Sequence, residues 1–163
     1  MGAPIVVVMG VTGSGKTTIG QLLSHALDVE FVDADDFHDE ASVEKMRRGE
    51  PLDDEDRAPW LDRLNAQLRA HMADGIVLAC SALKQSYRDR LTKDVEGVRF
   101  VLLTADPSLL RTRIATRTDH FAPVDLLPSQ LATLEPPKDA VVVDVSESPD
   151  LVTAELVRAL RST

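Results

Sequence analysis

The glycine-rich segment at residues 10–17 constrains the fold of this chain more than any other part of the sequence. It fits the pattern G-x-x-x-x-G-K-[ST], and its residues are Gly10, Val11, Thr12, Gly13, Ser14, Gly15, Lys16 and Thr17. The apolar run Ile5–Met9 precedes it, and a segment of helical period begins at Lys16. A segment of this pattern between a buried strand and a helix is typical of a P-loop.

The chemistry of this loop predicts a polyphosphate ligand. Three glycines let successive backbone amides face inward around an anion, and the dipole of the following helix adds positive potential there. We expect Lys16 to reach the β- and γ-phosphates of ATP, Thr17 to ligate Mg²⁺ through its hydroxyl, and Thr18 to complete the ATP site. The alternative is a glycine-rich turn with a solvated lysine. In that case both the motif and its position between strand and helix would match by accident.

The rest of the chain predicts an α/β fold. Short apolar runs rich in β-branched residues alternate with segments of helical period, which indicates a five-stranded parallel sheet covered by helices on both faces. With 163 residues, 44% of them hydrophobic, the chain has the size of one compact domain, residues 1–163. The predicted strands are Ile5–Met9, 30–32, 76–80, 99–103 and 140–145. The predicted helices begin near Lys16, Ser42, Asp54, Gln85, Pro107, Pro128 and Pro149.

Two segments between these elements have their own interpretation. The acidic run at residues 53–56 precedes a helical stripe, where carboxylates cap free amides and oppose the positive end of the helix dipole. We expect it to cap that helix rather than to bind a metal. Residues 118–127 fit neither sheet nor helix, and such a segment in a compact domain is often a mobile lid.

Composition excludes several classes of partner. The formal net charge is -9 and no block of basic residues breaks the acidic balance, so binding to nucleic acid or to an anionic membrane is not expected. The longest apolar run, Ile5–Met9, is far too short to span a bilayer, and we expect a cytoplasmic protein. The single cysteine, Cys80, ends an apolar run and is interpreted as a buried structural thiol.

A pair of carboxylates marks the expected acceptor side. Asp33 and Asp35 follow the second predicted strand, at the carboxyl edge where open α/β sheets bind ligands. The third strand ends in Cys80 and Ser81 without an acidic residue for Mg²⁺, so Asp33 is the nearest candidate. We expect Asp33 to serve the metal or to accept the acceptor's proton, and Asp35 to bind an acceptor hydroxyl. The alternative is a solvated turn.

Together with further short blocks, the glycine loop and the Asp33–His38 segment resemble those of the bacterial-type gluconate kinases of the P-loop kinase superfamily. The resemblance covers residues 5 to about 145, and its specificity comes from the order and spacing of many blocks. Those blocks are 9–17, 33–38, 45–46, 49–52, 54–61, 80–84, 87–89, Arg117, 120–121, 126–127, 129–130 and 134–135. The chain has Asp119 where the family commonly has Gly. The resemblance implies phosphoryl transfer from ATP to the 6-hydroxyl of D-gluconate, and a homodimer.

The same resemblance implies roles for further side chains. Gluconate offers one carboxylate and five hydroxyls, so its site needs a cation and short polar groups. The candidates for contacts to this acceptor, beside Asp35, are His38, Arg57, Lys84, Arg88, His120 and Gln130. Taken singly, each of these residues also fits an ordinary surface or structural role.

Two arginines precede the expected lid. Arg113 and Arg117 are four residues apart and share a helix face, so both are candidates for the ATP site. Either can bring positive charge to the transferring phosphoryl group, and Arg117 is the preferred catalytic candidate with Lys16 and Asp33. The alternative is that both are solvated helix charges.

Two other functions fit parts of the sequence. Another small-molecule kinase, such as one resembling shikimate kinase, also pairs a P-loop with Asp-x-Asp after the second strand. A regulatory module that holds ATP without transferring phosphate would share the P-loop, but it needs no set of acceptor-side residues.

Overall fold

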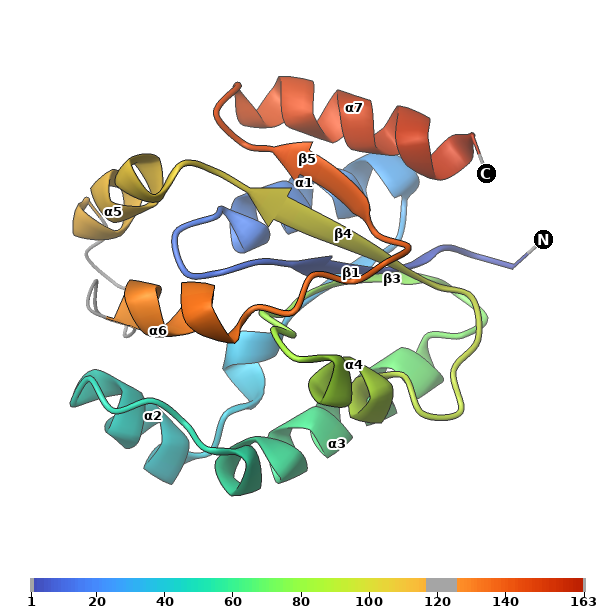
Figure 1. The fold of residues 1–163 in the computed structure, drawn as a ribbon. Helices are drawn as coiled ribbons and strands as arrows, with labels where there is room; N and C mark the ends of the chain where they lie inside the picture. The colour runs from blue at the N-terminus through green and yellow to red at the C-terminus, as the bar shows by residue number, and fades with distance from the viewer. Residues whose placement is uncertain (1, 117–125, 163) are drawn as a thin grey trace.

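The chain folds into a five-stranded parallel sheet with helices on both faces (Figure 1). The computed structural model describes residues 2–116 and 126–162. The strand order is β2-β3-β1-β4-β5, and all four pairings are parallel. The strands are β1 (Ile5–Met9), β2 (Glu30–Asp33), β3 (Ile76–Ala79), β4 (Val98–Thr104) and β5 (Val141–Asp144). The helices are α1 (Lys16–Leu27), η1 (Ala34–Phe37, a 3₁₀ helix), α2 (Glu40–Arg47), α3 (Asp54–Ala70), α4 (Gln85–Leu91), α5 (Pro107–Ala115), α6 (Leu126–Thr133) and α7 (Pro149–Arg161). The predicted α/β class and parallel sheet are confirmed.

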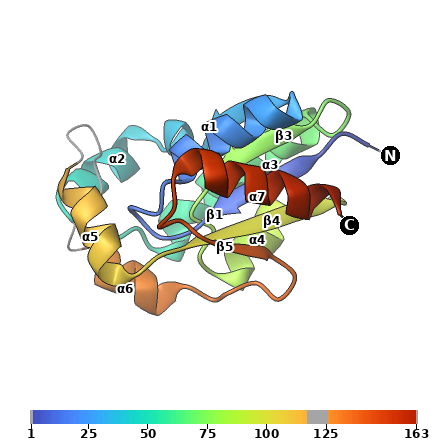
Figure 2. The ribbon, with the colours of Figure 1, turned by 90° about the horizontal axis from the view of Figure 1, so that it is seen from above.

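The central strand β1 explains the two-layered core. All five of its residues are buried, because α1 and α7 cover one face of the sheet and α3 and α4 cover the other (Figures 1 and 2). Successive side chains of a strand point to opposite faces. Val6 and Val8 therefore join the cluster under α1 and α7, whereas Val7 and Met9 join the cluster with α3 and α4.

The capping residues explain where two helices begin. Asp53 and Asp56 form a reciprocal capping box at the start of α3, so the predicted capping role of the acidic run is confirmed. Asp39 accepts a hydrogen bond from the Ser42 amide and starts α2 at Glu40, two residues before the predicted start. Ser42 therefore lies within the first turn of α2, where its amide needs a capping partner, and it does not begin the helix.

Other boundaries differ from the prediction by one or two residues. Helix α6 begins at Leu126 and not at Pro128, since proline is tolerated in a first turn where its missing N–H is not needed. Strand β2 extends to Asp33, which pairs in register with Ala79. Register against a neighbouring strand decides such ends, and it is not visible in local sequence.

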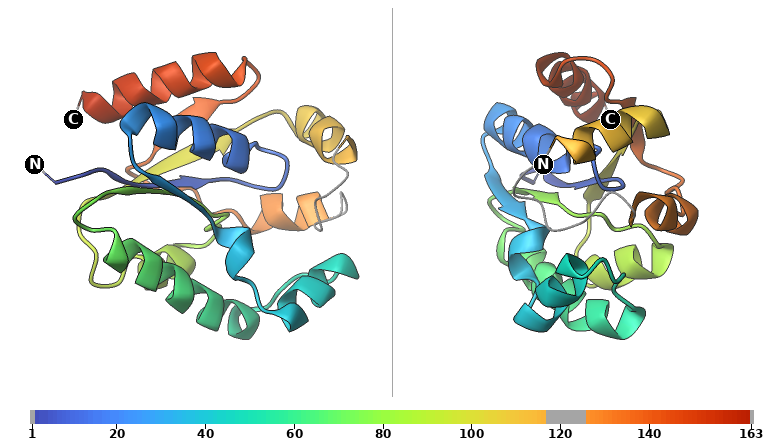
Figure 3. Two further views of the ribbon diagram at one scale, coloured as in Figure 1. Left: turned by 180° about the vertical axis from the view of Figure 1, so that it is seen from behind. Right: turned by 90° about the vertical axis from the view of Figure 1, so that its left-hand side faces the viewer.

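The carboxyl ends of all five strands lie at the same end of the molecule. Helices α2, α5 and α6 gather at this end, and the two termini lie at the opposite end (Figure 3). The predicted lid lies mostly outside the described residues, with only Leu126 and Leu127 in α6. None of the described helices is long and apolar enough to cross a membrane.

Candidate active site

The phosphate loop joins β1 to α1 at the carboxyl edge of the sheet. Gly13 has φ +84°, and a Cβ there would lie 2.9 Å from the Leu110 carbonyl oxygen and from Ile114 Cγ1. Gly15 is the N-cap residue of α1 with left-handed backbone, and no side chain caps this helix end. The first-turn amides of α1 are therefore available to an anion.

Lys16 and Thr17 follow the loop on the first turn of α1. The Lys16 ammonium donates to the Val11 carbonyl oxygen across the loop, at 3.1 Å. The Thr17 hydroxyl donates to Asp33 Oδ2 at 2.7 Å, and the other carboxylate oxygen of Asp33 accepts from the Asp35 amide at 2.9 Å. The end of β2 is thus tied directly to the first turn of α1.

This hydroxyl–carboxylate pair is the part of the site suited to Mg²⁺. Within residues 2–116 and 126–162, no group of three or more His, Cys, Asp or Glu side chains could hold a metal ion by itself. Mg²⁺ usually keeps several waters and takes one or two protein oxygens beside substrate phosphates. Thr17 and Asp33 supply oxygens of that kind, so the donor set fits Mg²⁺ bound with a nucleotide.

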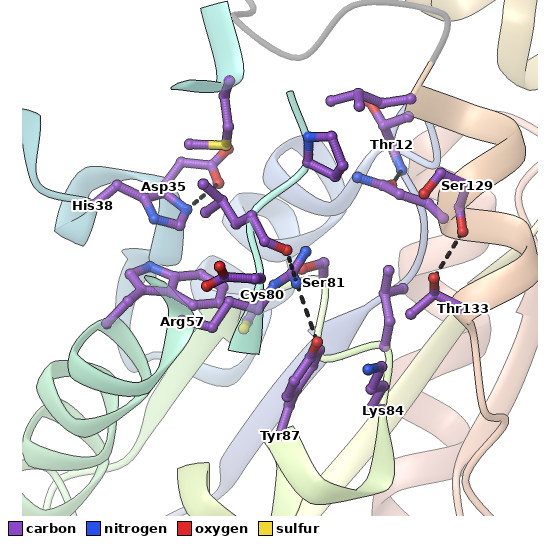
Figure 4. A pocket seen from close by; sticks show the side chains of 18 of the residues that line it. Thr12, Asp35, His38, Arg57, Cys80, Ser81, Lys84, Tyr87, Ser129 and Thr133 are labelled. Carbon is purple, nitrogen blue, oxygen red and sulfur yellow. Dashed lines mark hydrogen bonds and ion pairs between the residues drawn. The ribbon is translucent and has the colours of Figure 1, made fainter. Parts of the chain in front are cut away.

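A cavity of about 590 Å³ lies beside the phosphate loop. Asp35 and His38 lie on one side of it, and Ser129 and Thr133 of α6 lie on the other (Figure 4). The structure brings nine of the predicted site residues to this cavity. Those residues are Thr12, Lys16, Thr17, Asp33, Asp35, His38, Arg57, Lys84 and Gln130.

His38 is held in the cavity wall as a neutral side chain. Its ring stacks on Trp60 with centroids 4.3 Å apart, and the side chain is only 4% exposed. Burial, with a smaller contribution from Arg57, lowers the pKa of His38 to about 4. His38 Nε2 lies 3.9 Å from Asp35 Oδ1, and the described residues offer no partner to Nδ1. At neutral pH this imidazole can exchange hydrogen bonds with a hydroxyl but carries no charge.

Two cations face the cavity around the ring of Tyr87. The Arg57 guanidinium lies 5.0 Å from the ring centroid and the Lys84 ammonium lies 5.4 Å from it. Arg57 Nη1 donates to the Tyr87 hydroxyl at 3.1 Å and to the Leu52 carbonyl. Lys84 lies 3.4 Å from Asp54 Oδ1, which also accepts from the Tyr87 hydroxyl at 2.6 Å. The hydrogen bond from Tyr87 lowers the pKa of Asp54, and the nearby charge of Lys84 lowers it further.

Arg88 does not line either cavity. Its side chain is 2% exposed and donates to the carbonyls of Ala82 and Glu135 at 2.6 Å each. The predicted contact between Arg88 and the acceptor is not supported by this geometry, because the guanidinium is directed into the protein. Tyr87 of α4 and Lys84, the N-cap residue of that helix, line the cavity instead.

Gln130 connects α6 to the phosphate loop. Its side-chain oxygen accepts from the Thr12 amide at 2.6 Å. We predict that Gln130 contacts acceptor or phosphate, and the structure places it at the boundary between loop and cavity. The hydroxyl of Thr12 is buried without a partner in the described part of the chain.

A second cavity, of about 290 Å³, lies on the other side of the phosphate loop. Thr18, Arg113 and Glu147 contribute to its lining. Arg113 Nη2 donates to the Val145 carbonyl at 2.6 Å, so this side chain faces the end of β5. The other two predicted residues of the lid region, Arg117 and His120, lie outside the described residues, as does Asp119.

Several lining residues had no predicted role in ligand binding. They are Asp54, Trp60, Ser81, Tyr87, Ser129 and Thr133. The spacing of Lys84 and Tyr87, three residues apart, would have placed Tyr87 on the helix face of Lys84. The acidic run that contains Asp54 predicts only a helix cap. Cys80 is buried as predicted, and burial raises the pKa of its thiol to about 12.

Comparison with known proteins gives a consistent result. The family model described as shikimate kinase matches residues 12–158. A gluconokinase of Gluconobacter oxydans is 46% identical over 159 residues, which cover 93% of this chain and 88% of the relative. A thermosensitive gluconokinase of Escherichia coli is 40% identical over 161 residues, covering 94% of this chain and 86% of the relative.

Solved structures agree with these relatives. A sugar kinase from Janibacter superposes with a TM-score of 0.90 at 39% identity, covering 98% of this chain and 95% of that one. A gluconokinase from Sinorhizobium meliloti superposes with a TM-score of 0.83 at 38% identity, covering 98% of this chain and 96% of that one.

Proposed function

Because this chain belongs to the gluconokinase family of P-loop kinases, we propose that it transfers the γ-phosphoryl group of ATP to the 6-hydroxyl of D-gluconate, giving 6-phospho-D-gluconate and ADP. The observation that carries the proposal is the position of the phosphate loop between two cavities. One of these cavities combines cations with carboxylates, as a sugar acid requires.

The smaller cavity is the proposed nucleotide side. Thr18 and Arg113 line it, and the first turn of α1 directs its free amides toward the phosphates. Lys16 adds a point charge for the β- and γ-phosphates. Mg²⁺ would be held by Thr17 and Asp33, and when bound it neutralises charge on the phosphate oxygens. Arg117 remains our candidate for charge on the transferring group.

The larger cavity is the proposed acceptor side. Arg57 and Lys84 offer positive charge for the gluconate carboxylate, and Asp35 and His38 offer hydrogen bonds for hydroxyl groups. Asp33 lies beside Thr17, where a carboxylate can orient the attacking hydroxyl or accept its proton. His120 and Gln130 are candidates for further contacts.

An acceptor panel tests this function. Purified enzyme with ATP and Mg²⁺ is offered gluconate, glucose, related sugar acids and shikimate, and ADP formation is measured for each. We expect kcat/KM for gluconate to exceed that for glucose by a factor that can reach about 10⁴, because glucose leaves the partly buried partners of the carboxylate unmatched. Shikimate as the best acceptor would overturn the proposed substrate, and ATP binding without acceptor-stimulated ADP release would overturn the kinase activity.

The proposal extends to a cytoplasmic homodimer. ATP-dependent phosphorylation of a small sugar acid requires a compartment that holds both substrates. Sedimentation velocity would give the mass of the particle, for which a dimer of the 17.8 kDa chain is expected. Cell fractionation would give its location.

A further inference from the structure

The acceptor cavity contains a carboxylate that competes with the acceptor for positive charge. Asp54, the first residue of α3, lines the same cavity as Arg57 and Lys84. An acceptor carboxylate must therefore bind beside an anion that belongs to the protein. The arrangement around Tyr87 shows how Arg57 is kept from pairing with Asp54, which pairs with Lys84 instead.

Tyr87 stands between Asp54 and Arg57. Its hydroxyl accepts from Arg57 Nη1 at 3.1 Å and donates to Asp54 Oδ1 at 2.6 Å. The ion pairs of the described residues include Asp54 with Lys84, at 3.4 Å, but none between Asp54 and Arg57. A single hydroxyl thus satisfies the carboxylate on one side and the guanidinium on the other.

Arg57 keeps unused donors as a result. Only Nη1 of its guanidinium has hydrogen-bond acceptors among the described residues, namely Tyr87 and the Leu52 carbonyl. Nε and Nη2 therefore retain donors of the kind that pairs with a carboxylate in bidentate geometry. The ring of Tyr87 is packed in the core and 5% exposed, so its hydroxyl is held in place.

We propose that Tyr87 is a positioning residue for acceptor recognition: its hydroxyl separates the Asp54 carboxylate from Arg57, so that the guanidinium stays available to the carboxylate of the acceptor. This inference rests on the proposed function, since it requires an acceptor that carries a carboxylate. It assigns to Tyr87 and Asp54 roles in selecting for charge, and no role in the transfer step.

The test is a set of variants with a rescue. In Tyr87→Phe the ring remains, but Asp54 keeps only its pair with Lys84 and, without the tyrosine hydroxyl, becomes free to pair with Arg57 as well. We expect the KM and the calorimetric Kd for gluconate to rise about fivefold, near the upper value for a partly exposed ion pair. We expect kcat to stay within about twofold, because the transferring groups are untouched. Binding of glucitol, the polyol of equal length without a carboxylate, should not change.

Adding Asp54→Asn to Tyr87→Phe removes the competing carboxylate and should restore gluconate affinity to the value of Asp54→Asn alone. A matched control is Asp62→Asn in the same Tyr87→Phe background, since Asp62 lies on the same helix but pairs with Arg90 at 2.7 Å. That control should not restore affinity.

The possible results separate this inference from the proposed function. If the wild type is active but Tyr87→Phe leaves gluconate affinity unchanged, the inference alone is overturned. The same holds if Asp54→Asn fails to restore affinity in the Tyr87→Phe background, or if Asp62→Asn restores it equally. A wild type that neither binds nor phosphorylates gluconate would overturn both.

Discussion

At the scale of single residues, Asp33 has the most demanding position in the site. It ends β2, caps η1 through the Asp35 amide and accepts from the Thr17 hydroxyl. One carboxylate thus connects the strand edge, the acceptor wall and the phosphate loop. Its charge is separable from its capping role, because the side-chain oxygen of an asparagine can still accept from the Asp35 amide.

The variant Asp33→Asn tests that separation. It keeps the shape and the acceptor oxygen for the Asp35 amide but removes the charge and the second acceptor oxygen. We therefore expect kcat to fall about 100-fold or more and the Kd for ATP to change by less than about threefold. Asp36→Asn is the matched control, because Asp36 lies on the 3₁₀ helix that Asp33 caps, is exposed and does not line the cavity. Full kcat in Asp33→Asn would show that another group serves the metal and the attacking hydroxyl.

The lowered pKa of His38 should make the stability of the fold depend on pH. Its pKa falls from 6.5 to about 4 on folding, so below pH 6.5 the unfolded chain binds a proton that the folded chain does not. The free energy of unfolding should therefore drop as the pH falls through this window, with about 2 kcal/mol lost from this residue between pH 8 and pH 5.

The variant His38→Phe keeps an aromatic ring over Trp60 and removes the titrating group. Urea unfolding at pH 8 and pH 5 should give a pH-dependent loss about 2 kcal/mol smaller in the variant than in the wild type. An equal loss in both proteins would show that His38 titrates normally in the folded state.

At the scale of elements, Arg88 joins α6 to the loop between β3 and α4. Its guanidinium donates to Ala82 on one side and to Glu135, just after α6, on the other. Two more hydrogen bonds connect the same segments: the Glu135 amide donates to the Leu83 carbonyl at 2.8 Å, and the Gln85 amide donates to Glu135 Oε1 at 2.9 Å. The helix that carries Gln130 is thereby fixed to the loop that carries Lys84.

We expect Arg88→Met to destabilise the protein by about 3 kcal/mol, because it leaves buried carbonyls without donors. Arg90→Met is the control, since Arg90 is on the same helix in an exposed pair with Asp62 and should cost at most about 1 kcal/mol. Denaturant unfolding measures both. If the two variants lose the same free energy, Arg88 is not the connection between these elements.

At the scale of the whole molecule, the phosphate loop is where the parts of the structure meet. A small apolar cluster packs the loop against α5 and α6, and it consists of Val11, Leu83, Leu110, Ile114 and Leu127. The two cavities lie on either side of this loop. A ligand bound at the loop therefore contacts elements from both halves of the chain.

Nucleotide binding should consequently stabilise the whole fold. At ATP and Mg²⁺ concentrations 100 times the Kd, the gain is about 2.7 kcal/mol, or roughly 5 to 10 °C in Tm for a chain of this length. Lys16→Ala should unfold at the wild-type Tm without ligand and lose most of the ATP-dependent shift. Thermal scans with circular dichroism measure this, and an undiminished shift in the variant would contradict the assigned role of Lys16.

The sequence by itself determined the features that depend on local pattern. The P-loop, the parallel sheet and the capping role of Asp53 could be predicted because strand, loop and helix preferences act over a few residues. The order and spacing of short blocks likewise determined the family. Asp33 was found at the carboxyl end of its strand, where the topology of α/β sheets brings ligand-binding residues together.

Only the tertiary structure decided which polar side chains face the cavity. Arg88 lies on α4 and Lys84 is the N-cap residue of the same helix, yet Arg88 is buried and Lys84 lines the site. Asp54 caps nothing by itself and instead meets Tyr87 from another helix, thirty-three positions away. Such contacts depend on how helices pack across the sheet, and a helix face alone does not specify which partner it will meet.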